Sequence, residues 1–275
     1  MSSVAGGDPF PSSRGDRMDR LAMFSARIPF RLKVGAVWVV IFAVLGVFFS
    51  LAAYDVGWMR DNLSFIAGGL RYTMYMAVGG IALAIILATL GSLGRISHNP
   101  IAYGISGFYV SFFRGTPLLL QILFIYLALP QAGIVIPELP TGILALGLNY
   151  GAYMTEIFRA GIQAVPHGQV EAAQSLGMSN RTTFLRIVVP QAFRIVTPAI
   201  GNDFVAMLKD SSLVSVIAVQ ELLWRAQAAG RPTLQSMQTL LIAALVYWIM
   251  TIVFSLFQGR LERRMATGDR VRMAR

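Results

Sequence analysis

Long apolar runs alternate with short polar segments along most of the chain, and this alternation predicts a bundle of membrane-spanning helices. A helix of about 20 apolar residues crosses a hydrocarbon layer about 30 Å thick. Six runs of roughly that length are present, at 34–53, 65–93, 101–129, 141–162, 191–208 and 234–257. The pattern therefore predicts an all-α, polytopic transmembrane bundle of about six spans, embedded in the lipid membrane.

The two ends of the chain differ from this pattern. Residues 1–33 are rich in Ser, Gly, Pro and Arg and lack apolar periodicity, which predicts a basic tail, and residues 263–275 predict a second one. The uncharged run 34–53 is interpreted as an uncleaved helix. Its sequence Ser50-Leu51-Ala52 also fits a signal-peptide cleavage site, but the long preceding tail and the full spanning length favour an anchor.

Composition supports the assignment as a membrane protein, and the distribution of charge predicts its orientation. The 275 residues are 56% hydrophobic and 13% charged, about half the charged fraction of a soluble domain. The net charge is +10, and 17 of the 23 Lys and Arg residues fall in segments that share one side if the N-terminus is cytoplasmic, namely 1–33, 94–100, 159–194 and 259–275. By the positive-inside rule both termini are predicted to be cytoplasmic, and the charge needs no nucleic-acid partner.

Several kinds of catalytic and metal chemistry are excluded by the residues present. The chain contains no Cys, and its two His residues, His98 and His167, stand outside any metal-binding motif. A phosphate-binding loop needs Lys after Gly, whereas Lys33 and Lys209 both follow Leu. We therefore expect no metal site, no ATP hydrolysis in this chain and no enzyme activity.

The polar segment 166–190 is too long for a simple connection between two spans. Helix formers at 169–176 end at Gly177, which favours a left-handed helix cap. Ser179 is expected to cap a second, amphipathic helix over 180–189, and Pro190 is expected to break that helix before the next span. Spacing alone leaves two interpretations open: the helix pair rests on lipid headgroups, or it contacts a partner protein.

At this point the sequence resembles the polar amino acid branch of the permease subunits of ABC importers, including their EAA loop. The matches lie in order between residues 65 and 262 and are individually weak but jointly specific. They are Arg114-Gly115-Thr116-Pro117-Leu118-Leu119, Gly151-Ala152-Tyr153 with Glu156 and Arg159, Gly168-Gln169, Glu171-Ala172-Ala173 with Gly177, Pro190-Gln191-Ala192, and Lys209-Asp210-Ser211-Ser212-Leu213. The run 34–53 lies outside the family's five-helix core.

The resemblance implies a role for the polar segment as the coupling element that docks on a separate ABC ATPase subunit. Glu171 would be its polar anchor, Ala172 and Ala173 its close-packed face, and Gly177 its sharp turn. The residues implied in coupling are Gly168, Gln169, Glu171, Ala172, Ala173, Leu176, Gly177 and Pro190. Cofactors, ATP and Mg, would belong to the ATPase, and further partners would be an extracytoplasmic solute-binding protein and a second permease subunit in a prokaryotic inner membrane.

Ionisable residues inside the apolar runs are candidates for the substrate pathway, because charges in a membrane are costly. Arg114 could bind the carboxylate of an amino acid and Glu156 its ammonium, with Tyr153, Lys209 and Asp210 as further candidates. The competing interpretation is that these groups pair with each other or with carbonyls at broken helices. The alternative function is a stand-alone secondary amino acid transporter or channel, which would not require the cytoplasmic helix pair.

Gly147 and Gly151 form a small-xxx-small pattern in the fourth run. Such a pattern lets two helices approach closely. It does not distinguish a neighbour in the same chain from one in a second subunit.

Overall fold

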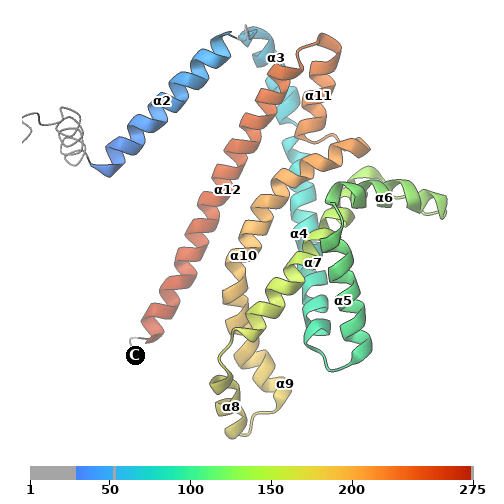
Figure 1. The fold of residues 1–275 in the computed structure, drawn as a ribbon, viewed down its shortest axis with the longest axis vertical. Coiled ribbons are helices and arrows are strands. Elements are labelled where there is room, and N and C mark those ends of the chain that lie inside the picture. Colours follow the sequence, from blue (N-terminus) through green and yellow to red (C-terminus); the bar gives the residue numbers. More distant parts are fainter. Residues whose placement is uncertain (1–28, 52–53, 274–275) are drawn as a thin grey trace, which may run out of the picture. The chain divides into compact units, whose positions relative to one another are not determined.

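The structure, a computed structural model, describes residues 29–51 and 54–273, and nearly all of them are helical. The described part of the chain contains no β-strand, which agrees with the predicted all-α class. The elements are α2 Phe30–Leu51, α3 Val56–Ala67, α4 Leu70–Ile96, α5 Pro100–Gly115, α6 Leu118–Gln131, α7 Glu138–Gln163, α8 His167–Ser175, α9 Asn180–Thr183, the π-helix η1 Phe184–Val188, α10 Val189–Asp210, the 3-10 helix η2 Ser211–Ile217, α11 Leu222–Thr233 and α12 Ser236–Met273 (Figure 1).

The helix α2 forms a unit of its own, separate from the unit that begins at Val56. It begins four residues before the predicted start of the uncharged run, so Arg31 and Lys33 are helical. Its stretch Phe30–Val47 is apolar enough to span a membrane, and none of those residues is buried. Most of the predicted N-terminal tail, residues 1–28, lies outside the described residues.

In the second unit, α7 lies at the centre and packs against α4, α5, α6 and α10 (Figure 1). Small residues allow the close contact between α7 and its neighbours. A Cβ added at Gly147 would lie 2.6 Å from Leu83 of α4, and one added at Gly151 would lie 2.6 Å from the hydroxyl of Tyr109 of α5. The small-xxx-small pattern therefore serves packing within this chain.

The third apolar run is not one straight helix. The helices α5 and α6 meet at an angle of 107° at the sequence Arg114-Gly115-Thr116-Pro117. Among the described residues, four helices are long and apolar enough to cross a membrane, or five if this bent pair counts as one span. The central helix α7 falls outside that set, and its 26 residues include the polar and charged side chains Asn149, Glu156 and Arg159. The predicted count of about six spans is thus not confirmed.

The polar segment begins as predicted. The helix α8 ends in a Schellman motif: Gly177 has a φ of +80°, its N–H donates to the carbonyl of Gln174, and the N–H of Met178 donates to that of Ala173. The side chain of Ser179 then accepts from the N–H of Thr182, as expected of an N-cap.

The predicted break at Pro190 is wrong. The chain is helical at every residue from Asn180 to Ile217. A π-helical turn precedes the proline, in which the N–H of Val189 donates to the carbonyl of Phe184 five residues earlier. Because the hydrogen-bond register changes there, Pro190 falls in the first turn of α10, where no amide donor is needed.

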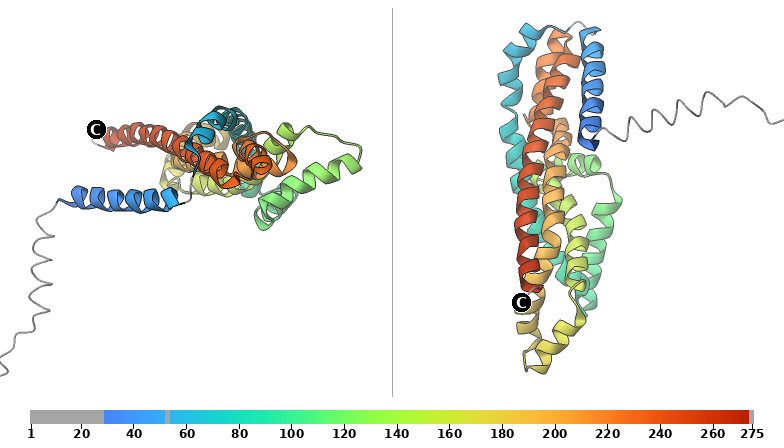
Figure 2. Two further views of the ribbon diagram at one scale, coloured as in Figure 1. Left: turned by 90° about the horizontal axis from the view of Figure 1, so that it is seen from above. Right: turned by 90° about the vertical axis from the view of Figure 1, so that its left-hand side faces the viewer.

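Figures 1 and 2 show the helices α8 and α9 at one end of this unit, beyond the ends of α7 and α10. The helices α3 and α11 lie at the opposite end, together with the start of α12 (Figure 1). The helix α12 continues to Met273, so residues 263–273 of the predicted basic tail are helical, whereas the apolar stretch long enough to span a membrane ends at Arg264. The polar segment is thus held at one end of the bundle.

Candidate functional site

The helix α8 has one face against its own chain and one face exposed. Ala173 is only 5% exposed, and the neighbouring Val170 packs on an apolar cluster of Val165, Val188 and Ala192. The amide of Gln191 donates to Gln169 at 2.8 Å, which ties α8 to the start of α10. The helix is therefore held firmly to the bundle although it has only nine residues.

The outer face of α8 carries Glu171 and Ala172, and the C-cap residue Leu176 follows them on the exposed side. Leu176 is 84% exposed, an unusual position for a large apolar side chain at a polar end of the molecule. The expectation that Ala173 shares this face is not met, because the helical turn directs it into the chain. A partner would therefore meet Ala172 and Leu176 rather than Ala173.

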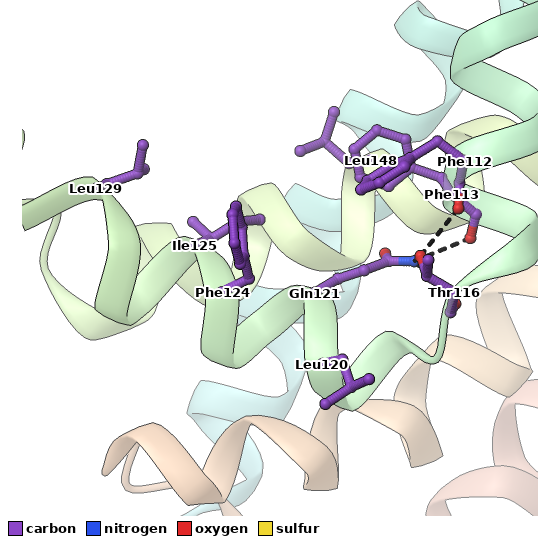
Figure 3. Close-up of a pocket in the computed structure, with 9 residues that line it drawn as sticks. All are labelled: Phe112, Phe113, Thr116, Leu120, Gln121, Phe124, Ile125, Leu129 and Leu148. Carbon is purple, nitrogen blue, oxygen red and sulfur yellow. Dashed lines mark hydrogen bonds between the residues drawn. The ribbon is translucent and has the colours of Figure 1, made fainter. Parts of the chain in front are cut away.

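The bend between α5 and α6 frees backbone carbonyl groups that two side chains satisfy. The amide of Gln121 donates to the carbonyls of Phe113 and Thr116 at 2.9 and 3.0 Å (Figure 3). Asn149 of α7 donates to the same Phe113 carbonyl at 3.2 Å and to the amide oxygen of Gln121 at 3.1 Å. Both amides are buried, so this network fixes the bend against α7.

An apolar cavity of about 360 Å³ lies along the bend (Figure 3). Its walls include Phe112 and Phe113 of α5, Phe124 and Leu129 of α6, and Leu148 of α7. No charged side chain is among its lining residues, so it offers no partner for a charged solute.

A polar cavity of about 390 Å³ lies where the start of α6 faces α7 and α10. Broken helices line solute sites in membrane transporters because their ends present unpaired backbone groups. Two carboxylates face this cavity from α10, and a tyrosine pair faces it from α7. The lining residues are Thr116, Pro117, Leu118, Asn149, Tyr150, Tyr153, Asp203, Ala206, Asp210 and Leu213.

The two carboxylates differ in their partners. Asp210 accepts a hydrogen bond from the hydroxyl of Tyr150 at 2.7 Å. The Oδ2 atom of Asp203 is buried and has no hydrogen-bond partner. Leaving a buried carboxylate oxygen unpaired is costly, which is typical of a site that binds a ligand.

Three of the sequence-predicted pathway residues come together here and two do not. The guanidinium of Arg114 lies 5.2 Å from the ring centre of Tyr153, which lines the cavity with Asp210. Lys209 is exposed and is not a lining residue. Glu156 lies one helical turn beyond Tyr153 and is also absent from the lining.

Glu156 forms ion pairs with two arginines outside the polar cavity. Its two oxygens accept from Arg95 of α4 at 3.2 Å and from Arg159 of α7 at 2.6 Å, and Arg95 also lies over the ring of Tyr103 of α5. The guanidinium of Arg95 therefore links α7, α4 and α5, whereas Arg159 pairs with Glu156 within α7. Glu156 is thus paired, but with Arg95 and Arg159 and not with Arg114 or another candidate pathway residue, as the competing interpretation had it.

The sequence interpretation overlooked Asp203, Asn149, Tyr150 and Gln121. Asp203 carried a usable signal, because it is an ionisable residue within the predicted fifth run. The other three are uncharged, and only the packing of α7 against α5, α6 and α10 places them at the cavity or the bend. The described residues contain no cluster of three His, Cys, Asp or Glu side chains that could hold a metal ion.

Comparison with known protein families and proteins gives consistent results. The model of the family described as binding-protein-dependent transport system inner membrane component matches residues 80–267. An L-cystine transport system permease protein of Bacillus subtilis (strain 168) is 38% identical over 201 residues, covering 73% of this chain and 86% of that protein. An arginine transport system permease protein of the same organism is 36% identical over 209 residues, covering 76% and 95%.

Solved structures show the same similarity. The crystal structure of an amino acid ABC transporter with histidines contains a chain that is 36% identical, with a TM-score of 0.69, covering 77% of this chain and 99% of that chain. A methionine ABC transporter in inward-facing conformations matches with a TM-score of 0.56 at 16% identity. At this low identity the match supports a shared fold only.

Proposed function

Because the chain belongs to the family of binding-protein-dependent transport system inner membrane components, we propose that it is the permease subunit of an ATP-binding-cassette importer for polar amino acids. The observation that carries the substrate class is the polar cavity at the α5–α6 bend, together with the amino acid transport functions in the names of the relatives. In this proposal Asp210 binds the α-ammonium group and Arg114 the α-carboxylate. Tyr153 lines the path between them.

The exposed face of α8 is the proposed docking surface for a separate ATPase subunit. Leu176 inserts into an apolar groove of the ATPase, and Glu171 pairs with a cationic group beside it. The buried face, held by Val170 and Ala173, and the Gln169–Gln191 hydrogen bond transmit the motion of the ATPase to α10. Gly177 and Ser179 keep α8 short and separately oriented, so it moves as one rigid body.

The remaining assignments follow from the proposed import function. A second permease subunit faces this one around the pathway, and an extracytoplasmic solute-binding protein delivers the amino acid at the end that carries α3 and α11. The end that carries α8 is cytoplasmic, in agreement with the distribution of Lys and Arg. Both termini are then cytoplasmic in a prokaryotic inner membrane, and ATP and Mg are bound by the ATPase.

Reconstitution in proteoliposomes tests the proposed function against the stand-alone transporter. The complete complex is expected to take up labelled amino acids only when ATP and the binding protein are present. Uptake by this chain alone, driven by an ion gradient, would establish the alternative.

Docking is tested by two substitutions of exposed leucines at opposite ends of the unit. Leu176→Asp places a charge in the proposed contact, so the ATPase subunit is expected to be lost on co-purification. Leu234→Asp is the control, because Leu234 is 94% exposed but lies at the α11 end. Retention of the ATPase by both variants would rule out α8 as the docking element.

A further inference from the structure

The polar cavity carries an unbalanced negative charge. Asp203 and Asp210 are its only charged lining residues, and no Lys or Arg is among the residues that line it. Arg114 lies beside the cavity wall, since its guanidinium is 5.2 Å from the ring centre of the lining residue Tyr153. The formal charge of these three groups together is −1, which complements a solute of charge +1.

The two carboxylates are too far apart to share one ammonium group. They stand seven residues apart on α10, which corresponds to roughly 10 Å along the helix axis. Both nevertheless face the same cavity, because seven residues are close to two helical turns. A solute that satisfies both must therefore carry two separated cationic groups.

The unpaired oxygen of Asp203 indicates which carboxylate serves the second group. Asp210 is already oriented by the hydrogen bond from the hydroxyl of Tyr150. It is therefore suited to bind the α-ammonium group, which every amino acid carries. The Oδ2 atom of Asp203 is buried without a partner in the described structure, so a cation placed there would satisfy an otherwise costly group.

We propose that the cavity selects amino acids with a cationic side chain, the class of arginine, lysine and ornithine. Asp203 pairs with the side-chain cation, Asp210 with the α-ammonium group, and Arg114 with the α-carboxylate. This selection rests on the proposed function, since it assigns the substrate class of the same cavity. A neutral amino acid would leave Asp203 unpaired and would bind more weakly for that reason.

A binding competition on the purified full-length chain in lipid nanodiscs tests the proposal without any substitution. Radiolabelled L-arginine is expected to bind, and unlabelled L-lysine to displace it. L-Glutamine and L-glutamate should need about ten- to a hundredfold higher concentrations, the range expected for a lost charge-assisted hydrogen bond. Displacement by L-glutamine as effective as that by L-lysine would overturn the cationic preference and leave the amino acid site intact.

A substitution that removes the charge of Asp203 then tests whether this residue is the source of the preference for cationic amino acids. Asp203→Asn keeps the size of the side chain and removes its charge, so the arginine dissociation constant is expected to rise about ten- to a hundredfold while that of glutamine changes little. Asp203→Glu, which restores the charge, should retain the preference. Glu138→Gln is the control for net charge, because Glu138 is exposed and outside the cavity.

The remaining outcomes separate the two proposals. An unchanged ratio of arginine to glutamine affinity in Asp203→Asn would refute the role of Asp203. Absence of binding by any of the four amino acids, in a chain whose helical content is intact, would contradict the proposed function itself and with it the selection.

Discussion

The turn at Gly177 offers a sharp test of how the polar segment is built. Gly177 has a φ of +80°, and a Cβ added there would meet nothing within 4 Å. Gly177→Ala therefore changes no packing, and its cost is that of holding a side-chain-bearing residue in the left-handed region, about 1–2 kcal/mol. The nine residues of α8 contribute little intrinsic stability to offset this cost.

The expected effect is local opening at the end of α8. A cost of about 1–2 kcal/mol corresponds to a five- to thirtyfold larger population of the opened end. The N–H of Met178, which donates to the carbonyl of Ala173, reports this opening in a hydrogen-exchange measurement on the purified protein. Its exchange is expected to accelerate by about the same factor.

Gly168→Ala is the matched control. Gly168 also has nothing within 4 Å of an added Cβ, but it lies in the first turn of α8 and has no positive φ. Alanine favours a helix more than glycine does, so exchange at Met178 should stay the same or slow. Equal acceleration by both substitutions, or by neither, would refute the assignment of the cost to the backbone of Gly177.

Three further substitutions test the packing and the site. Gly147→Leu is expected to lower the free energy of unfolding by about 1–3 kcal/mol because its side chain has no room beside α4, whereas Gly104→Leu, in open space, should have no effect in the same thermal unfolding assay. A maleimide should label Ala172→Cys rapidly and Ala173→Cys slowly, since only the first is exposed; equal rates would contradict the assigned face of α8. Glu156→Gln should lower stability by about 1–3 kcal/mol, since it removes the negative charge that Arg95 and Arg159 both contact, yet leave arginine binding unchanged; weakened binding in a stable variant would return Glu156 to the solute path.

Features that depend on residues near each other in the chain could be predicted from the sequence. The apolar runs predicted the helices, because a span in lipid must satisfy its own backbone hydrogen bonds. The left-handed cap at Gly177 and the N-cap at Ser179 were correct for the same local reason. The proposal that α8 docks on an ATPase came from the resemblance to a family, since spacing alone left a lipid-resting helix pair equally open.

Local rules were insufficient at Pro190. A proline is expected to break a helix, but the π-helical turn before it shifts the hydrogen-bond register and lets the helix continue. The packing of Val188 and Ala192 with Val165 holds that turn in place. Tertiary contacts therefore decided that the helix continues through Pro190, although the low helix propensity of proline predicted a break there.

The partners of the buried polar groups were decided by the tertiary structure. Glu156 pairs with Arg95, 61 residues away, and Asp210 accepts from Tyr150, 60 residues away. Which of these groups meet depends on the rotation of each helix about its axis and on the depth at which it packs. Those quantities are set by small residues in contact, such as Gly147 beside Leu83, and not by the hydrophobic pattern that specifies the helices themselves.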